Sequence, residues 1–253
     1  MDIVIIGSGN TAAILGRKLK AAGHNIVQIF GRNTMAASEL AYELDTDSTN
    51  YWNVVTQSAE LYIIAVADIA IEEVLKELRL KNKIIVHTAA AVSKDVLKSA
   101  SLNYGVFYPL QTLKRDSKHL PDTPIIIDAS NEDTFYKLLR LGESISTKVV
   151  HGNDDMRLKL HLAAVFCNNF SNHLYRLMED YCRKENVDFT LLIPLIAETG
   201  LRVIEMPPSK AQTGPAIRND HSTIENHKAL LAKHPHLKTI YELFTESIRQ
   251  YTG

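Results

Sequence analysis

The first residues with the types and spacing to do chemistry lie close to the N-terminus. Gly7, Gly9 and Ala12 stand in the pattern G-x-G-x-x-A, directly after an apolar run at residues 2–6. The first glycine permits a tight turn, the second lets a ligand approach the backbone, and the small alanine lets a helix pack closely on the strand. Free N–H groups at a helix N-terminus also attract phosphate. Five residues are predicted to contact a pyrophosphate: Gly7, Ser8, Gly9, Asn10 and Thr11.

This loop predicts a Rossmann-type dinucleotide site, and the end of the next strand bears on which cofactor it takes. Sites for NAD usually end this strand with Asp or Glu, which binds the ribose 2′-hydroxyl. Here the strand ends in Phe30-Gly31-Arg32-Asn33-Thr34, without an acid. Because Arg32 can pair with a 2′-phosphate and Asn33 can add a hydrogen bond, we expect NADP (NADPH), with NAD less favoured. Two alternatives stay open, a solvated loop arginine and a glycine turn without a dinucleotide.

Two later strands also end in polar residues. His87 and Thr88 follow one apolar run, and Tyr108 ends another, with Gln111 shortly after it. Carboxyl ends of parallel strands face the ligand crevice, so these residues are candidates for the nicotinamide and substrate end. For His87, a strand-end histidine with structural hydrogen bonds is the alternative interpretation.

A predicted long helix at residues 154–184 carries histidines and amides in an otherwise apolar stretch. At about 100° per residue, His161, Asn168 and Asn172 lie within roughly 20° of one direction, with Asn169 beside them. Polar groups on a helix face are costly to bury unless they are paired. The stripe predicts either a substrate-facing surface or helix–helix hydrogen bonds in a core or dimer interface.

A glycine–proline loop at residues 211–220 is the last candidate. Gln212 offers an amide, and Arg218 can bind a carboxylate in bidentate fashion. The alternative is a turn held by a contact between Arg218 and Asp220. Elsewhere the histidines and cysteines lack the spacing of metal ligands, so no metal site is expected.

Strands and helical stretches alternate over the first part of the chain, which predicts βαβ units and a mainly parallel sheet. After about residue 150 no strand pattern remains, and Ser222 with Glu225 forms a possible capping box for one later helix. We therefore expect an α/β fold with two domains. Residues 1–150 form a Rossmann dinucleotide-binding domain, and residues 151–253 form an all-helical domain for substrate binding and dimerisation.

Composition excludes several other classes of protein. Of the 253 residues, 45% are hydrophobic and 23% are charged, and the formal net charge is −1. Without a basic excess we expect no nucleic-acid partner. No apolar run is long enough to cross a bilayer, and no signal-type segment precedes the first strand, so no membrane partner and a cytoplasmic setting are expected.

The chain resembles a family of Rossmann-like NADP oxidoreductases whose C-terminal domain has no assigned function. The segments that carry this resemblance are Gly7–Ala12, Val106–Thr112, His161–His173 and Ala211–Arg218. The family is similar to deazaflavin-dependent NADP reductases and pyrroline-carboxylate reductases. More distantly it resembles 6-phosphogluconate dehydrogenases, and this wider group implies a helical C-terminal domain of the same type and a homodimer formed through it.

One departure from the wider group concerns the proton donor. Hydroxyacid dehydrogenases of that group carry a lysine one turn before an Asn-Asn pair, which Asn168-Asn169 resembles, but the corresponding position here is Val165. Lys159 is out of register, whereas His161, one turn further back, can donate a proton. We predict catalytic roles for His161, Asn169 and Tyr108, and substrate contacts from Gln111, Asn172, Gln212 and Arg218.

The predicted function is hydride transfer between the nicotinamide of NADP and a small substrate, which is a ketone, an imine or a deazaflavin. The alternative function is that of a non-catalytic, NADP-binding regulator or scaffold, because a fold alone does not establish chemistry.

Overall fold

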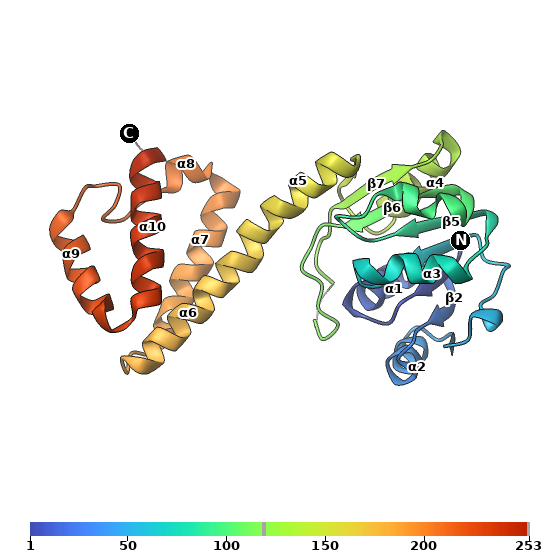
Figure 1. The fold of residues 1–253 in the computed structure, drawn as a ribbon, viewed down its shortest axis with the longest axis horizontal. Helices are drawn as coiled ribbons and strands as arrows, with labels where there is room; N and C mark the ends of the chain where they lie inside the picture. Colours follow the sequence, from blue (N-terminus) through green and yellow to red (C-terminus); the bar gives the residue numbers. More distant parts are fainter. Residues whose placement is uncertain (118–119, 252–253) are drawn as a thin grey trace. The chain divides into compact units, whose positions relative to one another are not determined.

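The computed structural model describes residues 1–117 and 120–251. The chain divides into two compact units, Met1–Asn169 and Phe170–Gly253 (Figure 1). Among the described residues the last strand is β8 (Val149–His151), and the helix that follows it, α5 (Asp154–Ala164), belongs to the first unit. Helices thus replace strands near residue 150, while the predicted domain boundary at that residue stays a prediction.

The first unit is built on one mainly parallel sheet. Within the described residues the sheet has eight strands in the order β3-β2-β1-β4-β5-β6-β7-β8, and only β6 and β7 run antiparallel to each other. The order from β3 to β6 is that of a Rossmann fold, with its switch point between β1 and β4. The other strands are β1 (Asp2–Ile6), β2 (Asn25–Phe30), β3 (Asp47–Thr49), β4 (Leu61–Ile64), β5 (Lys81–His87), β6 (Ser101–Pro109) and β7 (Ile125–Ala129).

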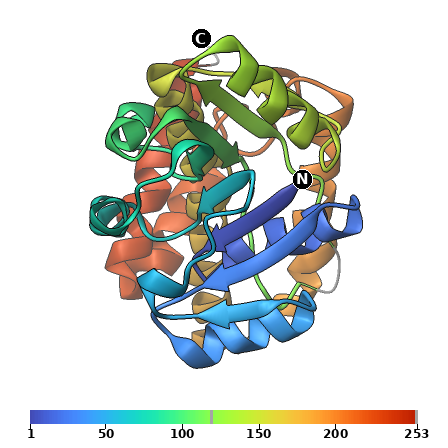
Figure 2. The same cartoon turned by 90° about the vertical axis from the view of Figure 1, so that its right-hand side faces the viewer.

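Helices cover both faces of this sheet (Figure 2). Successive side chains of a strand point to opposite faces, and β1 shows this directly, since Ile3 and Ile5 pack in one core and Val4 and Ile6 in the other. The first core includes residues of α1 (Asn10–Ala21), α2 (Thr34–Glu43) and α4 (Glu132–Glu143), and the second includes residues of α3 (Ile71–Glu77) and η3 (Lys94–Ser99). The two cores hold the carboxyl ends of the central strands in place.

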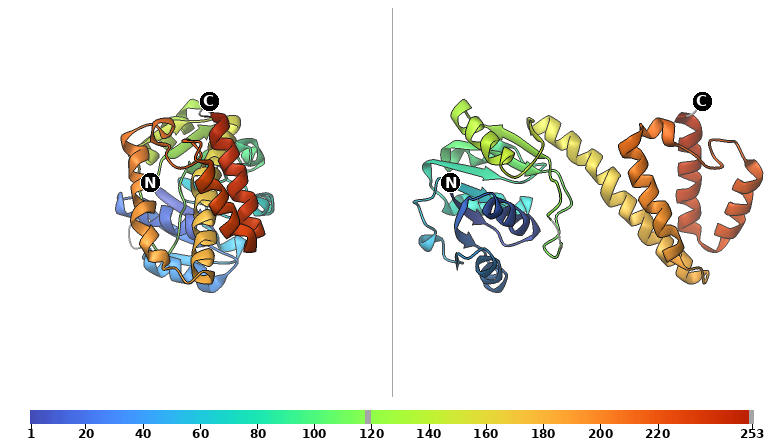
Figure 3. Two further views of the ribbon diagram at one scale, coloured as in Figure 1. Left: turned by 90° about the vertical axis from the view of Figure 1, so that its left-hand side faces the viewer. Right: turned by 180° about the vertical axis from the view of Figure 1, so that it is seen from behind.

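The second unit is helical throughout its described part. Consecutive helices turn back on each other, α6 on α7 and α9 on α10 (Figures 1 and 3). The elements are α6 (Ser171–Lys184), η5 (Phe189–Leu192), α7 (Ile193–Glu205), α8 (Pro208–Ala211), α9 (His221–Leu230), η6 (Leu231–Lys233) and α10 (Pro235–Tyr251). None of the described helices combines the length and the apolar sequence that a membrane span needs.

The predicted fold class is confirmed, and three local expectations need correction. The short strand β3 was not expected, because Asp47–Thr49 has only three residues and all of them are polar. The predicted capping box is wrong, since Asp220 caps α9 by accepting a hydrogen bond from the Thr223 N–H, while Glu225 pairs with Lys228. The third correction concerns the long helix. It contains the π-helical segment η4 (Val165–Phe170), where more than 3.6 residues make a turn, so the predicted alignment of His161 with the amides does not hold beyond Val165.

Candidate functional site

A pocket of about 570 Å³ lies at the carboxyl ends of β1, β2 and β4. This is the edge of the sheet where the strand order reverses, which is where ligands bind in open α/β sheets. Seven predicted cofactor-binding residues line it: Gly7, Ser8, Gly9, Asn10, Thr11, Arg32 and Asn33. The opposite wall comes from the segment after β4, with Ala65, Val66 and Ala67, and from α3, with Glu73 and Val74.

The two glycines of the loop are needed for different reasons. Gly7 has a φ of +132°, and a Cβ atom there would lie 2.2 Å from the carbonyl oxygen of Ala65, so the fold itself requires glycine. Gly9 has ordinary extended backbone, and among the described residues beyond its two chain neighbours no heavy atom lies within 4 Å of the position where its Cβ would be. A side chain at Gly9 would occupy the pocket without disturbing the fold. The residues present therefore fit a group that approaches this backbone closely, as the pyrophosphate of a dinucleotide does.

The N-terminus of α1 favours an anion at the same place. Among the described residues no side chain caps this terminus, and its first turn has no acidic residue. The N–H groups of the first turn therefore point a partial positive charge at the pocket. Asn10 has a second task, because its Oδ1 accepts a hydrogen bond of 3.1 Å from the backbone N–H of Arg115.

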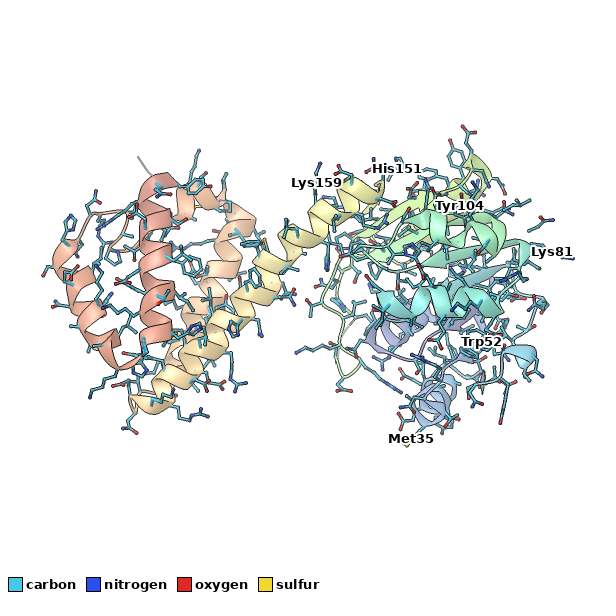
Figure 4. The ribbon with its side chains drawn as sticks, viewed as in Figure 1. Met35, Trp52, Lys81, Tyr104, His151 and Lys159 are labelled. Atoms are coloured by element: carbon cyan, nitrogen blue, oxygen red, sulfur yellow. The ribbon has the colours of Figure 1, made fainter. Side chains whose placement is uncertain are left out.

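The far end of the pocket is formed by aromatic and charged side chains. Trp52 stacks on Phe30 with ring centroids 3.7 Å apart, and Figure 4 labels Trp52 in the first unit. Arg32 Nη1 lies 3.1 Å from Glu73 Oε2, and both side chains are mostly exposed. Asn33 caps α2 by accepting a hydrogen bond from the Ala36 N–H, so its oxygen is already used.

His87 is fully buried and serves its own loop. The backbone N–H of Ala89 donates to His87 Nδ1 at 3.2 Å, which leaves the proton on Nε2, 3.3 Å from the carbonyl oxygen of Ser93. Burial lowers the pKa of the His87 imidazole from 6.5 to about 4. Thr88 donates its N–H to the Ile64 carbonyl oxygen across to β4. Neither residue lines the pocket, and for His87 these contacts favour the structural interpretation.

Tyr108 and His161 are brought together from different elements. Tyr108 is buried near the end of β6, and its hydroxyl lies 3.1 Å from Nδ1 of His161 on α5. Burial raises the pKa of the Tyr108 phenol, so the hydroxyl stays protonated and shares a hydrogen bond with the imidazole. This hydrogen bond occupies Nδ1 of the exposed His161 ring and leaves Nε2 for an external group. The pair therefore holds the imidazole in a position to exchange a proton through Nε2.

Arg157, one turn before His161, was missed by sequence reasoning. It is fully buried, and its guanidinium donates to the carbonyl oxygens of Ala90 and Val92 and to the Asp154 carboxylate. A charged residue on an amphipathic helix normally indicates a solvated face, so the sequence contains no signal for this role. Arg157 fixes α5 to the segment that follows β5, and it thereby positions His161.

The remaining predicted residues of the first unit are not gathered into one group. Asn169 is exposed within the π-helical segment, and segments of this kind are frequent at functional sites. Gln111 closes its own loop, since its amide donates to the Asp122 carbonyl oxygen and accepts from the Thr112 N–H. Lys159, labelled on α5 in Figure 4, is exposed and pairs with Asp155 at 2.6 Å.

Three predicted substrate-binding residues belong to the second unit. Asn172 is exposed on α6, and Arg218 is exposed in the loop before α9. Gln212 donates to the carbonyl oxygen of Thr213 and lines a hollow of about 310 Å³ beside α10. The positive charge of Arg218 contributes to the lowered pKa of Asp220, after the hydrogen bonds from Thr223. Among residues 1–117 and 120–251, no three His, Cys, Asp or Glu side chains gather closely enough to hold a metal ion.

The sheet order, the glycine turn and the pocket define a Rossmann dinucleotide-binding domain followed by a helical region. In agreement, residues 2–91 match a family described as NADP oxidoreductase, coenzyme F420-dependent, and residues 123–248 match a domain of unknown function, DUF2520. A crystal structure from Bacteroides fragilis, provisionally described as an NADP oxidoreductase, has 37% identity and a TM-score of 0.91 over 98% of each chain. The chain belongs to this family of NADP oxidoreductases, as its motifs predicted.

More distant solved structures share the fold alone. A 1-pyrroline-5-carboxylate reductase from Streptococcus pyogenes has 14% identity and a TM-score of 0.67, covering 99% of this chain and 98% of its own. An imine reductase from Myxococcus stipitatus in complex with NADP⁺ has 15% identity and a TM-score of 0.63, covering 99% of this chain and 93% of its own. A comparison with curated proteins finds no match.

Proposed function

We propose that the pocket of the first unit binds NADP and that the protein transfers a hydride between its nicotinamide and a small substrate. The observation that carries this proposal is Gly9, whose missing side chain leaves open space at the N-terminus of α1. Arg32 at the far end of the pocket supports the phosphorylated cofactor, because a guanidinium binds a 2′-phosphate with two parallel hydrogen bonds. When bound, the nicotinamide supplies or accepts the hydride.

His161 is proposed to supply the proton that such a reduction requires. Reduction of a ketone or an imine places negative charge on oxygen or nitrogen, and a positioned acid neutralises it. Tyr108 holds the His161 ring in one orientation through the 3.1 Å hydrogen bond, which leaves Nε2 for the substrate. Asn169, Asn172, Gln111, Gln212 and Arg218 remain candidates for substrate contacts.

Cofactor binding is tested first through thermal stability. The protein is heated with saturating NADPH, NADP⁺, NADH or NAD⁺, and a ligand at 100 times its dissociation constant stabilises a protein by about 2.7 kcal/mol. A larger shift with the two phosphorylated cofactors supports the proposal. No shift with any of the four contradicts it.

Catalysis is then tested by following nicotinamide absorbance with panels of ketones, cyclic imines and a deazaflavin. His161→Gln should lose turnover of any active substrate and keep its affinity for NADPH. Lys159→Gln, a change on the same helix at an exposed residue paired with Asp155, is the matched control and should keep full turnover. Cofactor binding without turnover of any panel would instead favour the non-catalytic regulator or scaffold.

A homodimer formed through the helical unit is part of the proposal. In the described part of this unit only four residues are buried, namely Cys182, Ala216, Ile224 and Thr245. Helix α7 has no buried residue, yet it carries several large apolar side chains that are more than half exposed, including Leu195, Leu201, Val203 and Ile204. A group of exposed apolar side chains of this kind is typical of a surface that another protein covers. We therefore propose that a second copy of the chain covers α7, which light scattering tests, since a monomer at micromolar concentration would contradict it.

A further inference from the structure

An acidic side chain stands at the place where the sequence indicated that none was present. The expectation of NADP rests partly on the absence of Asp or Glu at the end of β2. Glu73, from α3, fills this gap from the other side of the pocket, because its Oε2 lies 3.1 Å from Arg32 Nη1. A loop and a helix that are far apart in sequence thus bring a cation and an anion to one point.

The position of this pair relates it to the ribose of a bound dinucleotide. In Rossmann domains the residue after the second strand recognises the 2′ position of the adenosine ribose. Arg32 is separated from β2 only by Gly31, where a Cβ atom would lie 2.8 Å from the Cβ of Ala37, so this turn is tightly fixed. Glu73 also lines the pocket, and its carboxylate therefore lies within contact distance of the group that reads the 2′ substituent.

A carboxylate at this point affects the two cofactors differently. It repels a 2′-phosphate and competes with it for the guanidinium of Arg32. A 2′-hydroxyl carries no charge and can donate a hydrogen bond to a carboxylate. The same side chain thus opposes binding of NADP and is neutral or favourable for NAD.

We propose that Glu73 is a specificity-determining residue, an inference that rests on the proposed cofactor function. Glu73 holds Arg32 in the free protein and thereby limits the preference of the protein for NADP over NAD. Binding of a 2′-phosphate breaks the Arg32–Glu73 pair and replaces it with an Arg32–phosphate pair. The exposed fractions of 73% for Arg32 and 65% for Glu73 leave both side chains free to exchange partners. Exposed ion pairs contribute little to folding stability, so removal of the carboxylate should leave the fold intact.

The test measures dissociation constants of NADPH and NADH by calorimetry at one fixed, low salt concentration. Glu73→Gln should tighten NADPH by about three- to tenfold, which is the range expected for an exposed charge pair together with one charge repulsion. NADH should bind equally well or more weakly, so the ratio of the two constants rises. In an Arg32→Gln background the gain from Glu73→Gln should shrink, because no cation is left to release.

Glu72→Gln provides the matched control. Glu72 is the preceding residue on α3, is exposed and does not line the pocket, so this change removes the same charge from the same helix turn. It should leave the ratio of the two constants as in the wild type.

Three results would overturn the inference. If Glu73→Gln changes the NADPH constant no more than Glu72→Gln does, Glu73 has no role in specificity while the proposed cofactor function stands. Equal tightening of NADPH and NADH would mean a general effect of charge, which also contradicts a role at the 2′ position. A wild type that binds neither nucleotide would overturn the cofactor function and the inference together.

Discussion

The two units of this chain differ in how completely they bury their apolar side chains. The first unit encloses two cores on either side of its sheet, and strand residues such as Ile5 and Ile64 are fully buried. The described part of the second unit buries only four residues in the single chain, and Ile204 on α7 is 80% exposed. A sheet with helices on both faces buries its apolar side chains within one unit, whereas a small group of helices leaves some apolar side chains exposed unless other protein covers them. The first unit therefore contains a complete core and the pocket, whereas the second leaves many apolar side chains at its surface.

Within the first unit, a substitution in the glycine loop is expected to have the largest effect on folding stability. Gly7→Ala should destabilise the protein by roughly 3 kcal/mol or more, because the positive φ disfavours a side chain and the new Cβ meets the Ala65 carbonyl oxygen. Gly9→Ala should change stability by only about 0.5 kcal/mol. Denaturant unfolding measures both. Equal losses of stability would contradict the separation of a fold-determining glycine from a ligand-determining one.

Arg157→Met tests whether the first unit depends on a buried cation at its C-terminal end. We expect a loss of about 3 kcal/mol, because the buried carbonyl oxygen of Ala90 and the half-buried one of Val92 lose their donors. Lys159→Met on the same helix, where the cation is exposed, should be close to neutral. If both variants unfold at the same denaturant concentration, the anchoring role of Arg157 is wrong.

His87 makes the stability of the first unit depend on pH. The unfolded chain protonates this imidazole near pH 6.5, whereas the buried ring has a pKa of about 4. Below pH 6.5 the unfolded state binds the additional proton, so stability is lost as the pH falls towards about 4, by up to roughly 3 kcal/mol. His87→Gln should therefore lose less free energy of unfolding between pH 7 and pH 4 than the wild type.

The exposed His236 supplies the control for that measurement. His236→Gln should keep the pH dependence of the wild type. A His87→Gln variant with the same pH dependence as the wild type would show that His87 is not held neutral by burial.

Substitution of one exposed isoleucine in each unit compares the surfaces of the two units directly. Ile204 in the second unit is 80% exposed and Ile69 in the first unit is 95% exposed. If a second copy covers α7, Ile204→Glu should weaken assembly by about 2 kcal/mol, the value of one buried apolar side chain, and shift the sample towards monomer. Ile69→Glu should leave the assembly unchanged. Light scattering over a dilution series measures both, and an Ile204→Glu variant that dimerises like the wild type would contradict the difference drawn between the units.

The structure of a segment was predictable from the sequence where it depends on residues that are close together in the chain. Buried parallel strands are short apolar runs, and Gly7 to Ala12 stand between one such run and a helix, so the phosphate loop and the mainly parallel sheet around it followed from the sequence. Arg32 was identified in the same way, because it directly follows a strand end. The fold class and the part of the pocket formed by the glycine loop and Arg32 could therefore be predicted from the sequence.

Features that depend on distant contacts were not accessible. Glu73 and Trp52 reach the pocket from segments whose positions depend on how the sheet is ordered, and nothing in their neighbouring residues indicates a ligand. The burial of Arg157 depends on the Ala90–Val92 segment, far away in sequence. The π-helical segment at Val165–Phe170 also shifts the register of the long helix, which a constant angle per residue does not anticipate.

The most direct test of the central claim uses the emission of Trp52, which is the single tryptophan of the chain and lines the pocket. NADPH is titrated into the wild type and into Gly9→Val, whose side chain would fill the space reserved for the pyrophosphate. We predict saturable quenching in the wild type, weaker quenching with NADH, and loss of the response in Gly9→Val with the folding stability retained. No saturable response to either nucleotide, or an unchanged response in Gly9→Val, would contradict the assignment of this pocket to the cofactor.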